Sequence, residues 1–192
     1  MKTVIVGCGR VGATLAELFD RDGHEVIVLD VETRAFDRLP STFGGTAVRG
    51  DGTDEDTLRR AGAEDADVFL ALTEGDNRNV MSAQVAAEAL GAQQVIAKLN
   101  DPLRASAYAD LGLATLCRTT LMTDAVAEYL GMPVTGTPGV HAPSGTHHGG
   151  THQDSDGAAS TRGSPDGPAA GTASGGPATS GEAAAGTVAR EG

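Results

Sequence analysis

The sequence lacks any run of about 18 or more apolar residues, so no segment has the pattern of a membrane-spanning helix. Its two cysteines, Cys8 and Cys117, form no disulfide or metal-binding pattern and are typical of a reducing compartment. Basic residues are also few, 14 against 26 acidic ones, and the formal net charge is −12. Because nucleic acids and anionic membranes are bound through positive patches, this charge argues against both as partners.

Aromatic and large aliphatic residues are nearly absent from the last third of the chain. Residues 132–192 hold 14 of the 27 glycines, 6 of the 8 prolines and no aromatic residue. Such a segment buries too little apolar surface to offset the conformational entropy lost on ordering. We therefore predict a folded domain at residues 1–131 and a disordered, low-complexity tail at residues 132–192. The histidines of the tail lack acidic or cysteine partners at a fixed spacing, so we predict no metal site.

A glycine-rich loop lies close to the start of the sequence. An apolar run ends in Gly7, Cys8, Gly9, Arg10, Val11 and Gly12, and an amphipathic helical pattern follows. In such a loop, Gly7 permits the tight turn, Gly9 lets a pyrophosphate approach the backbone, and Gly12 lets helix and strand pack closely. The helix N-terminus presents unpaired N–H groups and a positive dipole end to phosphates. Because Met-Lys-Thr leads directly into this motif, we expect no removable signal peptide.

Asp30 ends the next apolar run, 18 residues after Gly12. At the end of a second strand, its carboxylate is placed to accept hydrogen bonds from both ribose hydroxyls, and its charge disfavours a 2′-phosphate. The strand before the loop, the helix after it and an acid at this distance make the motif specific. The sequence therefore predicts NAD or an adenine nucleotide rather than NADP as the ligand.

The first 131 residues alternate short β-branched runs with helical patterns. We predict strands at residues 2–6, 25–30, 46–49, 67–72, 94–99 and 114–117. We predict helices at residues 10–22, 32–39, 54–61, 76–90, 102–109 and 119–130. Six βα units with a phosphate-binding loop on the first predict an α/β fold, a Rossmann-like doubly wound parallel sheet of about six strands in the order 3-2-1-4-5-6. A ligand then lies across the carboxyl ends of the strands.

The segment after the third predicted strand adds two candidate ligand contacts. Gly52 allows close approach to the backbone, and Asp51 is placed to accept a hydrogen bond from an adenine amino group. Thr53 or Asp54 is expected to cap the helix that follows, because their side-chain oxygens accept from the first free amides of a helix.

Other polar residues follow the remaining strands. Thr73 is predicted near the nicotinamide-side ribose or a second phosphate, and Asp76 is predicted to cap the next helix. For Lys98, the sequence favours equally a pairing with a phosphate and a pairing with an acidic neighbour. Arg10 opposes the helix dipole, so we expect it either to clamp the pyrophosphate or to reach a second subunit. Arg118 is expected at an interface.

These stretches occur together, in order and at a familiar spacing, through residues 1–130. They are Gly7-Cys8-Gly9-Arg10-Val11-Gly12, Asp30, Gly50-Asp51-Gly52-Thr53-Asp54-Glu55, Leu58, Ala61-Gly62, Ala66-Asp67, Ala71-Leu72-Thr73, Asp76-Asn77-Arg78-Asn79, Ala97-Lys98 and Asp101-Pro102. They resemble the nucleotide-binding domain of the KTN/RCK family, of the TrkA-N type found in regulatory subunits of bacterial potassium uptake. Arg10, Asp30, Asp51 and Thr73 match the family's ligand-contacting positions.

The resemblance implies a Rossmann-like dimer, often assembled into a ring, that binds NAD(H) or ATP/ADP as a regulatory ligand. It also implies a cytoplasmic regulatory subunit, docked on a Trk/Ktr-type membrane potassium transporter at the inner face of the plasma membrane. Family members usually carry a smaller ligand-sensing domain after the last helix, where this sequence continues into the low-complexity tail. We therefore expect the chain to pair with itself or with a longer homologous subunit.

A small NAD-dependent oxidoreductase is the alternative function, and it requires a proton donor or base near the nicotinamide. Neither Tyr108 nor Tyr129 begins a Tyr-x-x-x-Lys spacing, and His24 precedes the second strand, at the end of the sheet away from the ligand. Lys98 is the one candidate catalytic group. Cys8 is interpreted as a small, half-buried residue rather than a reactive thiol. No complete catalytic site is visible, so we predict a protein that is not an enzyme.

The last predicted helix has a broad apolar stripe. Its members are Leu121, Met122, Ala125, Val126, Tyr129 and Leu130. This stripe covers either the edge of the sheet within one chain or the surface of a second subunit. The resemblance favours the second subunit.

Overall fold

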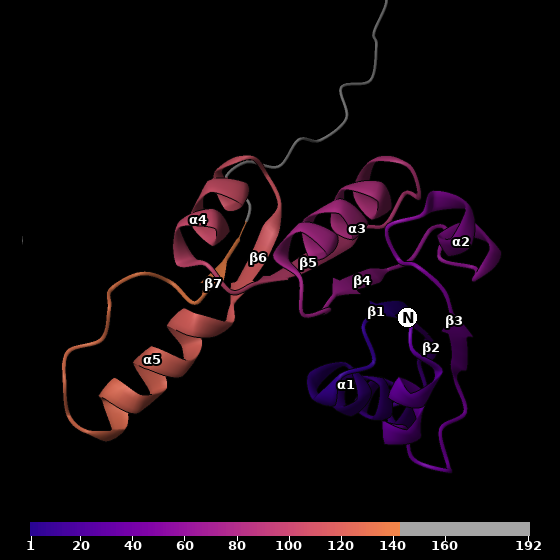
Figure 1. Ribbon diagram of the computed structural model, residues 1–192, viewed down its shortest axis with the longest axis horizontal. Helices are drawn as coiled ribbons and strands as arrows, with labels where there is room; N and C mark the ends of the chain where they lie inside the picture. The colour runs from indigo at the N-terminus through magenta and orange to yellow at the C-terminus, as the bar shows by residue number, and fades with distance from the viewer. Residues whose placement is uncertain (143–192) are drawn as a thin grey trace, which may run out of the picture. The chain divides into compact units, whose positions relative to one another are not determined.

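A seven-stranded sheet forms the centre of the computed structural model, which describes residues 1–142 (Figure 1). Its strands are β1 (Lys2–Val6), β2 (Glu25–Asp30), β3 (Thr46–Arg49), β4 (Val68–Ala71), β5 (Gln94–Leu99), β6 (Ala114–Cys117) and β7 (Val140–His141). They lie in the order β3-β2-β1-β4-β5-β6-β7, and the first six are parallel. The predicted Rossmann-like sheet and its strand order 3-2-1-4-5-6 are therefore confirmed.

Helical segments connect the parallel strands, as the alternating pattern predicts. They are α1 (Arg10–Arg21), the 3₁₀ helix η1 (Thr33–Arg38), α2 (Glu55–Arg60), α3 (Asp76–Glu88), α4 (Pro102–Asp110) and α5 (Arg118–Tyr129). The predicted bounds of every strand and helix differ from these by at most two residues. The segment predicted as a helix at residues 32–39 is a short 3₁₀ helix. It ends at Arg38 because Leu39, which precedes Pro40, adopts an extended conformation.

Side-chain caps fix where two of the helices begin. The Asp54 carboxylate accepts from the Thr57 amide at 3.0 Å, so Asp54, one of the two candidates left open by the sequence, is the N-cap of α2. The Asp101 carboxylate accepts from the Leu103 amide at 2.9 Å, and Pro102 occupies the first position of α4, where its missing N–H costs nothing.

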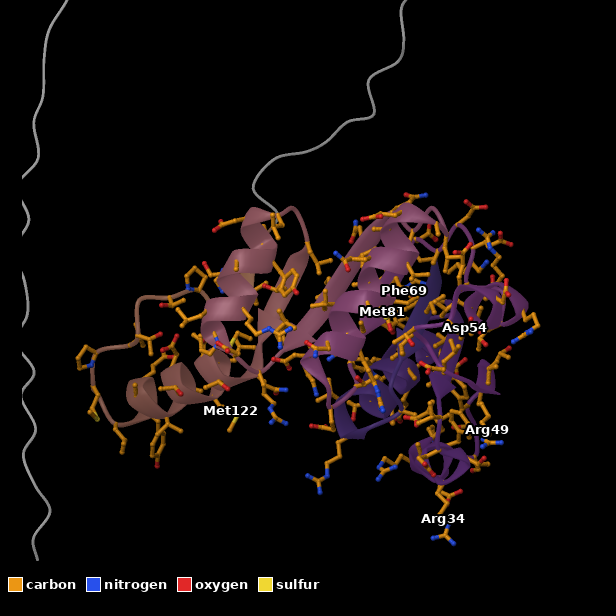
Figure 2. All side chains as sticks on the ribbon, turned by 45° about the horizontal axis from the view of Figure 1, so that its top comes forward. Arg34, Arg49, Asp54, Phe69, Met81 and Met122 are labelled. Carbon is orange, nitrogen blue, oxygen red and sulfur yellow. The ribbon has the colours of Figure 1, made fainter. Side chains whose placement is uncertain are left out.

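The central strands supply two apolar layers because successive residues of a strand point to opposite faces. On one face, Val4 and Phe69 pack with Leu58 of α2 and with small residues of α3 (Figure 2). On the other face, Ile5 and Val28 pack with alanines of α1. Figure 1 shows α2 and α3 on one side of the sheet and α1 on the other. Both faces of β1 are therefore buried, as its continuous apolar run predicts.

A seventh strand extends the sheet past the predicted domain boundary at residue 131. Val140 and His141 pair antiparallel with Leu116 and Thr115 of β6, and the Cys117 amide donates to the Gly139 carbonyl at 2.7 Å. Two residues are too short to show an alternating pattern, so no sequence signal marks this strand. The part of the predicted tail from residue 143 onward lies outside the described residues.

Helix α5 leaves its apolar stripe exposed. Thr120 is its one buried residue, whereas Met122, Val126 and Tyr129 are exposed, Tyr129 by 90%. In Figure 1, α5 extends away from the end of β6, and Figure 2 shows Met122 on a surface of this helix. The interpretation that this stripe covers the sheet edge within one chain is therefore wrong. Among residues 1–142, no helix is both long and apolar enough to cross a membrane.

We predict that Gly12→Ala destabilises the fold, because a Cβ at Gly12 would lie 2.0 Å from the Gly7 carbonyl oxygen. The helix must shift from the loop, which lowers the free energy of unfolding by about 1–3 kcal/mol or more. Gly9→Ala is the matched control, since nothing lies within 4 Å of a Cβ there and the loss is below about 1 kcal/mol. Urea denaturation measures the free energy of unfolding of both variants. An equal loss in the two variants would contradict the close contact between helix and loop at Gly12.

Candidate functional site

A crevice runs along the carboxyl ends of the parallel strands and consists of two adjoining hollows. The β3-side hollow, of about 210 Å³, is lined by Gly7, Asp51, Gly52, Thr53, Thr73, Arg78 and their neighbours. The α1-side hollow, of about 670 Å³, is lined by Cys8, Arg10, Val11, Gly12, Glu32, Arg34, Arg38, Lys98 and Arg118. Gly9, Asp30, Leu72 and Glu74 line both. All residues predicted to contact the nucleotide thus meet in one crevice, and their contact with a ligand stays a prediction.

The three loop glycines meet three different constraints. Gly7 has a φ of 105°, and a Cβ there would lie 2.9 Å from the backbone of Leu72 and of Thr73. Gly12 is pressed against the Gly7 carbonyl, as described above. A Cβ on Gly9, in contrast, would meet open space. Only Gly9 therefore leaves bare backbone facing the crevice, which is the role expected of the central glycine.

The N-terminus of α1 faces the crevice without a protein anion of its own. Its N-cap, Gly9, provides no side-chain cap, and the first turn contains no acidic residue. The first amides of a helix are strong donors at the positive end of its dipole. Arg10 adds a full positive charge at the first helical position and lines the α1-side hollow. This end of the crevice therefore favours an anionic group.

The Asp30 carboxylate lies at the junction of the two hollows and also holds the loop in place. One oxygen accepts from the Cys8 amide at 2.7 Å, and the other accepts from the Glu32 amide at 2.9 Å. An ionised carboxylate has about four lone-pair positions, so each oxygen can accept a further hydrogen bond. Asp30 can thus serve the loop and a ligand hydroxyl at the same time.

Cys8 is buried completely, more than the half-burial expected from the sequence. Burial raises the pKa of the Cys8 thiol, the negative charge of Asp30 raises it further, and Arg38 opposes this to a smaller extent. The thiolate is the reactive form of cysteine, so the raised pKa and the burial together make this thiol unreactive. The preference for a structural Cys8 agrees with this geometry.

Asp51 and Gly52 line the β3-side hollow in different ways. The Thr53 amide and hydroxyl both donate to one oxygen of Asp51, at 3.0 and 2.8 Å, and lower the pKa of that carboxyl. Asp51 is therefore ionised at neutral pH and presents an acceptor. A Cβ on Gly52 would lie 2.3 Å from the Val6 side chain. The absence of a side chain at Gly52 thus serves the packing of the loop on β1.

Thr73 is held by a buried asparagine. The Thr73 amide and hydroxyl donate to Asn79 Oδ1 at 2.8 and 2.7 Å, and Asn79 Nδ2 donates to the carbonyls of Thr73 and Lys98. Asn79 is fully buried and so ties the end of β4 to the end of β5. Thr73 lines the β3-side hollow.

The prediction that Asp76 caps α3 is wrong. The N-cap is Gly75, without a side-chain bond, and Asp76 is the first helical residue. The Asp76 carboxylate accepts instead from the Asn100 amide and side chain, at 3.0 and 2.7 Å, and from the Asp101 amide. Amides of the neighbouring loop compete for this carboxylate, so it fixes the loop after β5.

Lys98 pairs with an acidic neighbour in the described structure. Its ammonium lies 3.6 Å from Glu74, and the same carboxylate lies 3.6 Å from Arg118. The Lys98 side chain is only 7% exposed, while that of Glu74 is 83% exposed. Of the two partners that the sequence left open for Lys98, the structure thus contains the acidic neighbour, Glu74, which also pairs with Arg118.

Sequence reasoning gave no role to several residues of the crevice. Glu74 and Arg78 lie on the loop and helix after β4, and Arg34 and Arg38 lie on η1. Figure 2 shows Arg34 extending away from the ribbon, and its charge adds to those that line the α1-side hollow. For the three arginines, the available signal was their position in the helical segments directly after β2 and β4, in an acidic chain. Within residues 1–142, no group of three or more His, Cys, Asp and Glu side chains is placed to hold a metal ion.

A family model described as the TrkA-N domain matches residues 3–119. The chain belongs to the TrkA-N domain family. A curated relative from Streptomyces coelicolor, the Trk system potassium uptake protein TrkA, is 45% identical over 130 residues, which are 68% of this chain and 58% of the relative. The chain spans about half the length of this relative and of two archaeal relatives, and about a quarter of the length of two longer ones.

Solved structures support the fold assignment. The TrkA-N domain of the inner membrane protein ybaL from Escherichia coli is similar with a TM-score of 0.60 and 19% identity, over 67% of this chain and 96% of that chain. The GsuK channel bound to NAD is similar with a TM-score of 0.53 and 20% identity, over 68% of this chain and 23% of that chain. At these identities, the similarity establishes the Rossmann-like fold of the TrkA-N family.

We predict that neither cysteine of the native protein reacts readily with a thiol reagent at pH 7–8. Cys8 and Cys117 are both buried, and the raised pKa of Cys8 keeps it protonated in this range. The reaction with Ellman's reagent is expected to be at least about a hundredfold slower than in denatured protein, since it requires local opening. Rapid modification of one thiol that disappears in Cys8→Ala contradicts the structural role of Cys8.

Proposed function

We propose that this chain is a nucleotide-sensing regulatory subunit of a potassium uptake transporter, and that its crevice binds NAD(H) or ATP/ADP. The membership of the TrkA-N family supports this proposal, as do the potassium uptake name of the Streptomyces relative and the similarity to a channel bound to NAD. The proposed partner is a Trk/Ktr-type membrane subunit. The chain would then act in the cytoplasm, at the inner face of the plasma membrane.

The crevice itself carries the proposal. The uncapped α1 N-terminus and the open backbone at Gly9 suit a diphosphate, while Asp30 has acceptor capacity left for a ribose. Asp51, ionised beside the β3-side hollow, suits the amino group of adenine. These three groups follow the order of phosphate, ribose and base in an adenine nucleotide.

A regulatory role requires two conformations that bind the ligand differently. A differential affinity of about 1–3 kcal/mol gives a useful switch. The phosphate end of the crevice is the place where NAD, ADP and ATP differ most in charge. Five cations line the α1-side hollow there, and they include Arg10, Lys98 and Arg118. We propose that the ligand changes the geometry between subunits, which the membrane partner then detects.

The exposed stripe of α5 is the proposed contact between two copies of the chain or with a homologous subunit, in a dimer that can assemble into a ring. Met122, Val126 and Tyr129 are 63%, 54% and 90% exposed, and Leu130 extends the same apolar surface. Contiguous exposed apolar surface of this kind marks an interaction site.

We predict that Asp30→Asn weakens the binding of NAD or ADP by about 1–3 kcal/mol, because the charged acceptor for the ribose hydroxyls is lost. Titration calorimetry measures the affinity, and thermal unfolding checks that the variant is folded. Glu88→Gln is the matched control, since it removes one charge from an exposed position at the end of α3.

A second variant separates ligand contact from loop stability. Gly9→Ala keeps the bond between Asp30 and the Cys8 amide but adds a methyl group facing the crevice. It is expected to weaken nucleotide binding while the protein remains folded. Unchanged affinity in both variants contradicts the proposed site. Sustained NADH oxidation that requires Lys98 favours the oxidoreductase instead.

We predict that Val126→Asp shifts the protein from dimer to monomer, because a buried, unpaired carboxylate opposes association. Light scattering after size-exclusion chromatography measures the mass. Leu103→Asp is the matched control, since Leu103 is 82% exposed but lies on α4. A wild-type chain that is monomeric throughout, or a dimer that both variants retain, contradicts the α5 interface.

A further inference from the structure

Five cationic side chains line the α1-side hollow, although the chain as a whole is strongly acidic, and two of them, Arg34 and Arg38, belong to η1. Arg10, Lys98 and Arg118 come from the starts of α1 and α5 and the end of β5, and all three line this hollow. One protein anion, Glu74, lies 3.6 Å from both Lys98 and Arg118. Glu74 is thus the point of contact between the loop after β4 and the two cations.

An anion stabilises both partners of Glu74, and Lys98 needs it more than Arg118, whose side chain is 55% exposed. The Lys98 side chain is more than nine-tenths buried, and a buried ammonium is unfavourable without a counter-charge. Arg118 occupies the first position of α5, whose first turn contains no acidic residue, so the helix dipole repels its charge. Among residues 1–142, Glu74 is the ion-pair partner recorded for each of them.

Glu74 is itself held weakly. Its side chain is 83% exposed, and both of its ion pairs are longer than a direct charge-assisted hydrogen bond of about 2.7–2.9 Å. Ion pairs of exposed side chains contribute little, because water and side-chain entropy compete with them. A phosphate that enters the hollow can therefore replace this carboxylate at small cost.

We propose that Glu74 is an internal counter-anion that the ligand's phosphates displace, and that it sets the preference of the crevice according to ligand charge. This inference rests on the proposed nucleotide site. In the free chain, Glu74 neutralises Lys98 and Arg118. In the complex, a phosphate pairs with both cations, and the carboxylate turns to solvent. The exchange disfavours ligands with no anionic group at this position.

The inference predicts that Glu74→Gln strengthens binding in proportion to ligand charge. The gain is expected to be about tenfold for ATP at low salt, smaller for ADP and AMP, and absent for adenosine, and it should shrink at high salt. Calorimetric titration of each ligand measures the series. Glu32→Gln is the matched control, since Glu32 lines the same hollow but has no recorded cationic partner. A general effect of charge would appear equally in both variants.

Two further measurements separate this inference from the proposed function. Inorganic tripolyphosphate probes the phosphate end without a nucleoside, so its tighter binding to Glu74→Gln supports the inference even if no nucleotide binds. In the double variant Glu74→Gln/Lys98→Met, the gain for ATP and tripolyphosphate is expected to fall well below that in Glu74→Gln alone, because the two residues act as a pair. The inference is overturned if Glu74→Gln leaves the ATP, ADP and tripolyphosphate affinities unchanged, or if Glu32→Gln matches it.

Discussion

The hydrogen bond from the Cys8 amide to the Asp30 carboxylate is the constraint on which the crevice depends. It joins the glycine loop to the end of β2, and the Gly7 amide reinforces the connection by donating to the Leu29 carbonyl at 2.7 Å. The loop is thereby held open above the sheet, with Gly9 uncovered. The same carboxylate holds the loop in place and lines the crevice. The conformation of the loop and the binding of a ligand therefore both depend on Asp30.

The parallel sheet was predictable from the sequence because its central strands, β1, β2 and β4, are largely buried on both faces. In β1, the consecutive apolar residues Val4, Ile5 and Val6 are all buried, so polar and apolar positions do not alternate there. The turn glycines were equally predictable, since the positive φ of Gly7 and the contact at Gly12 exclude a side chain on simple steric grounds. Both are local properties, which a single sequence records well.

The features that sequence reasoning missed depend on partners distant in the chain. Aspartate is a common N-cap residue, but the carboxylate of Asp76 accepts hydrogen bonds from amides that lie 24 and 25 residues further along the chain. For Gly52, the sequence did not reveal that the Val6 side chain of β1 occupies the space that a side chain would need. Strand β7 pairs with β6 through two residues that carry no pattern. The ion pair between Lys98 and Glu74 likewise could not be predicted without knowing that the loop after β4 lies beside the end of β5.

The junction between β6 and α5 contains no loop, since Cys117 ends the strand and Arg118 begins the helix. The direction of α5 is therefore set where the chain leaves the sheet, at the margin of the crevice. Twelve helical residues, at about 1.5 Å each, form a rod about 18 Å long. Tilting such a rod by about 10° at its base moves its far end by about 3 Å, by simple geometry. A displacement too small to disturb the sheet would thus be amplified at Tyr129 and Leu130.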